Sequence, residues 1–219
     1  AMPEADKLCG EERRGNSGTA PWQRITITKG ANDNVFDRNR FEEKTWKTET
    51  VFQGRIISLQ VEHVTLPDGT RSTREVVKHP GAVAVLAVHE GKMLVVEQYR
   101  KALQRALVEI PAGKLEPGED PLAAAARELQ EETGFSAREL VPICSFYTSP
   151  GFADELIHLY YADQLEKGDA SPDADEFLSV QALTLDEAKR AIADGAIRDA
   201  KTTFAVYAWQ LYQMTGSFA

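Results

Sequence analysis

The sequence is poor in the residues that build disulfide frameworks and zinc sites. It has 2 cysteines, Cys9 and Cys144, and 4 histidines among its 219 residues. So few cysteines exclude the disulfide scaffold of a small secreted domain, and the scattered histidines supply no zinc-type cluster of ligands. A metal site in this chain would therefore have to be built from carboxylates, which prefer hard cations.

Long hydrophobic runs and an excess of positive charge are also missing. No apolar stretch approaches the roughly 20 residues of a membrane-spanning helix, and the N-terminus lacks the basic and then apolar order of a secretory signal. These absences predict a cytoplasmic protein without a membrane partner. The 34 acidic and 25 basic side chains give a net charge of −9, which would repel a phosphate backbone, so nucleic acid is not an expected partner.

Hydrophobic patterning divides the chain into three segments. Residues 1–44 show no sustained periodicity and are predicted to form a tail. Residues 45–79 hold alternating segments rich in β-branched residues, which predict a small antiparallel sheet. Residues 80–219 combine dense apolar strand segments with amphipathic helical segments, a pattern typical of a mixed α/β domain with one core.

The expected elements follow from period, turn residues and helix caps. Strands are expected at 45–52, 56–65, 71–79, 82–88, 93–99, 108–111, 142–147, 155–162 and 176–182. Helices are expected at 121–133, 185–192 and 200–214, and residues 165–175 are predicted to form an acidic loop.

The helix at 121–133 carries three acidic residues with a chemically informative spacing. Residues three and four apart share a helix face, so Glu128, Glu131 and Glu132 should lie together. The apolar stripe that should pack on a sheet lies roughly opposite, at Leu122, Ala125, Ala126, Leu129 and Thr133. The crowded charges favour a bound hard cation, and a solvated acidic surface is the alternative.

The residues before this helix extend the pattern. Gly113, the turn at 117–118 and Glu119 precede Arg127 at fixed distances. The stretch 113–135 resembles the Nudix box, G-x5-E-x7-R-E-U-x-E-E-x-G-U with U an apolar residue, and every defined position matches. A chance match in a chain of this length is on the order of one in a million, so the motif outweighs the reading of a solvated surface.

The resemblance implies a fold and a metal site. The fold is the α/β/α sandwich with a mixed sheet, preceded here by the small antiparallel sheet. Cleavage of a diphosphate by this family depends on cations, and carboxylates suit Mg²⁺ or Mn²⁺. Four positions would hold the metal: the main-chain carbonyl of Ala112 and the carboxylates of Glu128, Glu131 and Glu132.

The remaining motif residues would support this site. Arg127 is expected to orient the glutamates, and Glu119 to brace the loop against the helix. A scaffold pair of Arg127 and Glu119 without contact to substrate is the alternative. Gly113 and Gly134 are expected to be structural, and Gly134 is well placed to end the helix.

Three further segments resemble the bacterial ADP-ribose pyrophosphatases, a branch of the same family. They are 96–100 with 108–113, 149–155, and 175–177. This likeness covers roughly 45–214 and implies hydrolysis of ADP-ribose to AMP and ribose 5-phosphate, with other nucleotide sugars as secondary substrates. It also implies a homodimer in which the N-terminal sheet packs on the partner and contributes to the nucleotide pocket.

Six positions would bind substrate by this likeness: Arg74, Glu75, Arg100, Glu109, Pro150 and Gly151. Arg100 would contact the diphosphate or the terminal ribose. Glu109 would lie against ribose or metal, or form a salt bridge with Arg100 or Arg105. Arg74 and Glu75 would hold the adenine end, and edge-strand charges that prevent aggregation are the alternative for this pair.

The general base and the contact to adenine are the remaining features of the substrate site. Glu176 is expected to be the general base, with Asp173, Asp175 or a purely solvating loop as alternatives. Some relatives stack adenine on an aromatic residue after the first hairpin glycine, but here Arg55 and Ile56 follow Gly54. This departure predicts a looser adenine clamp or a broader base preference.

Two rival functions follow from the same residues. One is a Nudix hydrolase of another nucleotide, such as a GDP-sugar, a dinucleotide or an oxidised nucleoside triphosphate. The other is a non-catalytic module that senses ADP-ribose, which would be expected to lack the glutamates of the motif. All of these glutamates are present, so the hydrolase is favoured.

Overall fold

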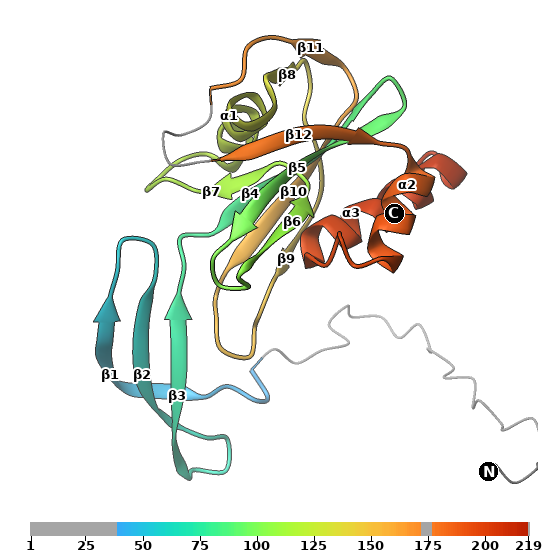
Figure 1. The fold of residues 1–219 in the computed structure, drawn as a ribbon. Helices are drawn as coiled ribbons and strands as arrows, with labels where there is room; N and C mark the ends of the chain where they lie inside the picture. The colour runs from blue at the N-terminus through green and yellow to red at the C-terminus, as the bar shows by residue number, and fades with distance from the viewer. Residues whose placement is uncertain (1–38, 172–176, 219) are drawn as a thin grey trace, which may run out of the picture. The chain divides into compact units, whose positions relative to one another are not determined.

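A computed structural model describes residues 39–171 and 177–218 of the chain (Figure 1). Most of the predicted tail lies outside the described residues, as do the three candidate bases Asp173, Asp175 and Glu176. The elements below belong to one compact unit, Phe41–Ala219. No helix in the described part of the chain has the length and apolar content needed to cross a lipid bilayer.

The N-terminal sheet has three antiparallel strands in the order β1-β2-β3. They are β1 Lys44–Gln53, β2 Ser58–Thr65 and β3 Arg71–Lys78. The β2–β3 hairpin turns at Asp68, whose carboxylate accepts a hydrogen bond from the Thr70 amide at 2.9 Å. The small antiparallel sheet predicted from alternation is therefore confirmed.

The central sheet has seven strands and mixes both pairing directions. Its main path is β12-β5-β4-β10-β9, with β6 paired to β5 and β7 paired to β4. Only the β4–β10 pair is parallel among its described pairings. The strands are β4 Ala82–His89, β5 Lys92–Arg100, β6 Arg105–Glu109, β7 Ala112–Lys114, β9 Val141–Tyr147, β10 Leu156–Ala162 and β12 Leu178–Leu183.

Helices cover both faces of this sheet (Figure 1). The helix α1 (Pro121–Thr133) packs on one face, and α2 (Leu185–Ala193) and α3 (Ala200–Thr215) pack on the other. Strand β4 serves both layers because alternate side chains point to opposite faces. Val85 packs in the same hydrophobic cluster as the buried residues of α1, and Leu86 packs in the same cluster as the buried residues of α3. This arrangement confirms the predicted α/β/α sandwich.

The helix α1 begins and ends where its sequence predicts. The Asp120 side chain accepts hydrogen bonds from the amides of Leu122 and Ala123, at 3.0 and 3.1 Å. Gly134 follows the last turn with a φ of 74°, a left-handed conformation that glycine adopts without strain. Both signals are local, which explains the agreement of the predicted and observed bounds.

Two predicted segments differ from the structure. The strand expected at 108–111 is replaced by two, β6 and β7, which pair with different neighbours on either side of Ile110. The predicted acidic loop at 165–175 begins with a short strand, β11 (Leu165–Lys167), paired with β8 (Phe135–Ala137). Strands this short are stabilised by pairing with distant residues, and their own sequence gives little indication of them.

Candidate active site

The side of α1 that faces the sheet carries two of the three glutamates. Glu128 is 8% exposed and Glu132 is 1% exposed, whereas Leu122 is 46% exposed. The predicted apolar stripe is therefore wrong at Leu122 and Ala126, which are exposed, and Ala124 is buried in place of them. The acidic and apolar residues share the buried side because strand β7 provides a polar backbone for the carboxylates.

Arg127 lies among three carboxylates. Its Nε and Nη2 donate to the two oxygens of Glu119 at 2.9 and 3.0 Å. Its Nη1 donates to Glu128 at 2.8 Å and to Glu131 at 2.9 Å. The hydrogen bonds from Arg127 lower the pKa of Glu119, aided by the amide of Glu116. Arg127 thus links the loop before α1 to both glutamates.

Strand β7 fits tightly against the two buried glutamates. A Cβ atom on Gly113 would lie 1.9 Å from the Glu128 carboxylate, so only glycine leaves room for that carboxylate. The Ala112 amide donates to Glu132 Oε2 at 3.0 Å. These two contacts set the position of α1 against the loop that enters the motif.

The three glutamates contact one guanidinium and one backbone amide. Glu128 and Glu131 contact Arg127, and Glu132 contacts the Ala112 amide. Within residues 39–171 and 177–218, no three histidine, cysteine or carboxylate side chains are grouped as a ready metal site. The available donors are carboxylate and carbonyl oxygens, which fit a hard divalent cation, and Gly113 supplies the space for one carboxylate.

A cavity of about 630 Å³ opens beside Glu132. It extends from the first hairpin of the N-terminal sheet to the start of α3. Residues that matter for its chemistry are Ile56, Arg100, Glu109, Ala112, Glu132 and Lys201. A volume of this size suits a small-molecule ligand, and the lining combines both signs of charge with apolar groups.

One wall of the cavity contains a buried carboxylate with two cations. Arg100 Nε and Nη2 each donate to one oxygen of Glu109 at 2.7 Å, and Lys201 contacts the same carboxylate. Burial alone would raise the pKa of Glu109, but the hydrogen bonds and charges of Arg100 and Lys201 outweigh it and lower the pKa. Arg105 donates instead to the Gly195 carbonyl. Of the alternatives for Glu109, the salt bridge with Arg100 is observed.

Sequence reasoning missed Lys201, although one signal was available. Lys201 is the second residue of α3, after the N-cap Asp199. A cation in the first helical turn is disfavoured by the helix dipole, so its presence there indicates a partner outside the helix. The structure identifies that partner as Glu109.

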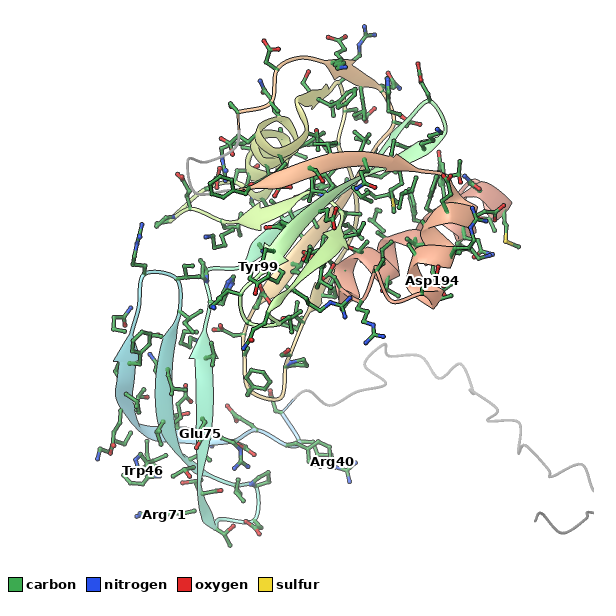
Figure 2. All side chains as sticks on the ribbon, viewed as in Figure 1. Arg40, Trp46, Arg71, Glu75, Tyr99 and Asp194 are labelled. Carbon is green, nitrogen blue, oxygen red and sulfur yellow. The ribbon has the colours of Figure 1, made fainter. Side chains whose placement is uncertain are left out.

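Four of the predicted substrate positions are not among the described residues that line this cavity. Arg74 is exposed on β3 and pairs with Glu43, and Glu75 is exposed beside it (Figure 2). Pro150 and Gly151 are exposed in the β9–β10 loop. The residues that line the cavity from this loop are Thr148, Ser149 and Glu155. The roles of these four residues stay predictions.

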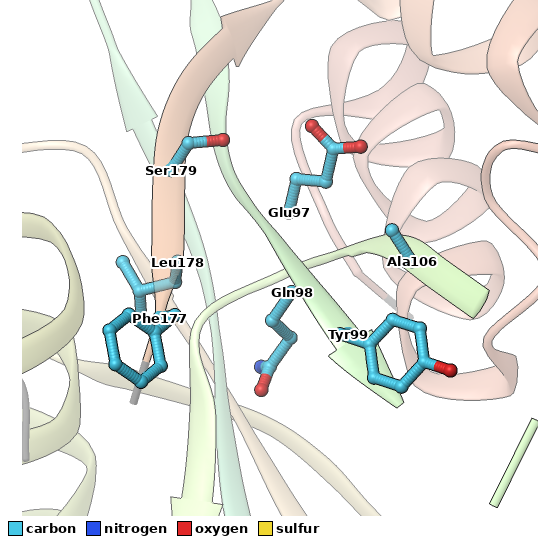
Figure 3. A pocket seen from close by; sticks show the side chains of 7 residues that line it. All are labelled: Glu97, Gln98, Tyr99, Ala106, Phe177, Leu178 and Ser179. Carbon is cyan, nitrogen blue, oxygen red and sulfur yellow. The ribbon is translucent and has the colours of Figure 1, made fainter. Parts of the chain in front are cut away.

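A second hollow of about 440 Å³ lies where β5, β6 and β12 meet. Figure 3 shows the rings of Tyr99 and Phe177 on either side of Gln98. Both rings are exposed, and Gln98 also borders the larger cavity.

Two family models match adjacent parts of the chain. The NUDIX domain matches residues 77–206. The nucleoside diphosphate sugar hydrolase N-terminal domain matches residues 43–77, which hold the three-stranded sheet. Together they span the N-terminal sheet and the central sheet.

Several known proteins and one solved structure resemble this chain over most of their own length. The chain is 55% identical to the methanol dehydrogenase activator of Bacillus methanolicus, over 79% of this chain and 95% of that protein. It is 53% identical to the ADP-ribose pyrophosphatase of Bacillus subtilis (78% and 94%) and 33% identical to the GDP-mannose pyrophosphatase of Cronobacter sakazakii (66% and 84%). The crystal structure of an ADP compounds hydrolase has the same fold, with a TM-score of 0.72 and 19% identity over 81% of this chain and 97% of that one.

Proposed function

Because this chain belongs to the Nudix family, we propose that it hydrolyses the diphosphate bond of ADP-ribose to AMP and ribose 5-phosphate. The observation that carries the proposal is the meeting of the motif with Arg100 at one cavity, which Ala112 and Glu132 also line. The 53% identity to an ADP-ribose pyrophosphatase supports the choice of substrate.

Nudix hydrolases generally need divalent metal ions, and Mg²⁺ is the ion proposed here, with Mn²⁺ as a substitute. Glu128, Glu131, Glu132 and the Ala112 carbonyl would hold it. When bound, the metal would neutralise charge on the diphosphate oxygens and so ease the approach of water to phosphorus.

The chain's own residues would bind the substrate and move the proton. Arg100 would hold the diphosphate through its guanidinium, whose planar fork matches phosphate oxygens. The oxygen of water bonds to one phosphorus, the bridging P–O bond breaks, and the leaving phosphate keeps the electron pair. Glu176 is proposed to accept the proton from water, with Asp173 and Asp175 as the alternatives in the same segment.

Ile56 supports a broader substrate range at the nucleoside end. It borders the cavity in place of the aromatic residue that some relatives use against adenine. An aliphatic side chain offers contact area but cannot stack on the base. Ring stacking would contribute about 1 kcal/mol to binding. Other nucleoside diphosphate sugars are therefore proposed as secondary substrates.

The N-terminal sheet is proposed to dimerise the protein. Trp46, Val51 and Phe52 on β1 are all more than half exposed, and a small sheet needs a covering surface. Arg74 and Glu75 on the same sheet would then reach the partner's cavity. Sedimentation equilibrium is expected to give the mass of two chains, and a single-chain mass at micromolar concentration would contradict this proposal.

Product analysis tests the reaction itself. Incubation of the purified chain with ADP-ribose and Mg²⁺ is expected to release AMP and ribose 5-phosphate in equal amounts, and EDTA is expected to stop the release. GDP-mannose, a dinucleotide and an oxidised nucleoside triphosphate form the comparison panel. A methanol dehydrogenase assay belongs in the same series, given the 55% identity to an activator of that enzyme.

The panel separates the proposal from its rivals. Faster cleavage of another nucleotide would identify that nucleotide as the substrate, and the chain would still be a Nudix hydrolase. Tight binding of ADP-ribose without any cleavage would show a sensing module and would overturn the enzymatic proposal.

A further inference from the structure

Lys201 is a buried charge that the Nudix motif does not explain. It is 7% exposed, and it borders the cavity from the first turn of α3. Its Nζ contacts Glu109 and lies 3.1 Å from Asp199 Oδ2. A lysine is rarely buried to this extent without a partner of opposite charge, so its contacts identify its role.

The main partner of Lys201 already has a complete partner of its own. Glu109 is 2% exposed, and Arg100 donates to both of its oxygens. One guanidinium fork suffices to neutralise one carboxylate. Glu109 therefore receives two cations for its single negative charge, because Lys201 adds a second contact on Oε2.

Asp199, 3.1 Å from Lys201, cancels only part of this surplus positive charge. Its carboxylate caps α3, accepting hydrogen bonds from the Thr202 amide at 2.9 Å and the Thr202 hydroxyl at 2.7 Å. The N-terminus of a helix carries roughly half a positive charge, which offsets part of the charge of a capping carboxylate. The wall formed by Arg100, Glu109 and Lys201 thus keeps positive character toward the cavity.

Arg100 is the group through which this charge can act. Its side chain is part-exposed and lines the cavity. The Nε and Nη2 atoms are used by Glu109, and no hydrogen-bond partner of Nη1 is present among the described residues. The free edge of the guanidinium is therefore available to an anionic group in the cavity.

We propose that Lys201 is a positioning residue for substrate binding. It neutralises Glu109, so that Arg100 stays fixed by Glu109 while its charge remains available to the diphosphate of the substrate. This inference rests on the proposed function and adds to it a residue that acts through Glu109 and Arg100 without touching substrate.

The test is a comparison of one substitution in two backgrounds. Lys201→Met is expected to raise KM for ADP-ribose about 10-fold while kcat changes less than about 3-fold, since the loss concerns binding more than the chemical step. In the Glu109→Gln background, the same substitution is expected to change KM less than about 2-fold, because there is no carboxylate charge left to neutralise. Lys167→Met, on exposed strand β11, is the matched control and should leave both constants unchanged.

The outcomes are distinct. A similar rise in KM in both backgrounds would mean that Lys201 contacts substrate or only supports α3, and it would overturn the proposal. An unchanged KM for Lys201→Met alone would overturn it as well. Circular dichroism and thermal melting check folding, and Lys201→Gln replaces Lys201→Met if the latter does not fold.

Failure of the proposed function would be seen separately. The comparison involves four proteins: the wild type, Lys201→Met, Glu109→Gln and the double variant. If the wild type does not cleave ADP-ribose, these proteins are titrated calorimetrically with ADP-ribose, or assayed with the nucleotide sugar that is cleaved. Lys201→Met is then expected to raise Kd in the wild-type background and to leave Kd nearly unchanged in the Glu109→Gln background. The absence of this difference would overturn the role of Lys201 whatever the substrate.

Discussion

Glu132→Gln is expected to lower kcat for ADP-ribose hydrolysis by at least ~10²-fold while the protein stays folded. Glu132 is 1% exposed and borders the cavity. Glutamine has nearly the same shape as glutamate, and its carbonyl oxygen can still accept the hydrogen bond from Ala112 that Oε2 accepts at 3.0 Å. The other oxygen becomes an amide nitrogen, which is a poor ligand for a hard cation.

The measurement is AMP release at saturating ADP-ribose and Mg²⁺, together with a thermal melt of each protein. Glu166→Gln is the matched control because Glu166 is exposed on β11 and pairs with Arg138 at 2.7 Å, away from the motif. The control should keep wild-type turnover. Wild-type turnover in Glu132→Gln would refute the assignment of Glu132 as a metal ligand.

Gly113→Ala is the second substitution with a large expected effect. Its new methyl group would lie 1.9 Å from Cδ and Oε1 of Glu128, so the glutamate or strand β7 must move. A displacement of about 1 Å in a catalytic arrangement can lower the rate about 10²-fold, and overpacking of this kind costs about 1–3 kcal/mol of stability. We therefore expect a kcat at least ~10²-fold lower, with a reduced melting temperature.

Gly168→Ala provides the comparison for this substitution. The nearest heavy atom to a Cβ at Gly168 is the Gly134 carbonyl oxygen at 3.4 Å, an ordinary contact. Its kcat and melting temperature should stay close to those of the wild type. If Gly113→Ala kept full activity, the close approach of Glu128 to β7 would have no part in catalysis.

Local signals in the sequence were sufficient to predict the bounds of the helix that carries the motif. Asp120 and Gly134 cap α1 with hydrogen bonds to residues within four positions, so no distant residue had to be known. The three strands of the N-terminal sheet were predictable for a similar reason, because alternation and the turn at Asp68 act over a few residues. The strands β8 and β11 were missed since each depends on the other, about thirty residues away in the chain.

Helical spacing predicted which residues share a face of α1, but it did not predict which face is buried. The burial of Glu128 and Glu132 depends on β7, whose backbone supplies the Ala112 amide and the space at Gly113. An apolar pattern alone placed Leu122 and Ala126 against the sheet, where the structure instead has the glutamates. At these positions the polar partners from strand β7 decided which side of α1 is buried, and the hydrophobic pattern did not.

By itself, the sequence determined the family and the motif helix, and it predicted oxygen ligands for a metal, because all three follow from residue types at fixed short spacings. Only the tertiary structure decided which charges meet at the cavity wall. Glu109 and Lys201 are 92 positions apart, and their contact exists because the last residue of β6 and the first turn of α3 come together. Contacts of this kind depend on the packing of whole elements, and no local pattern encodes them.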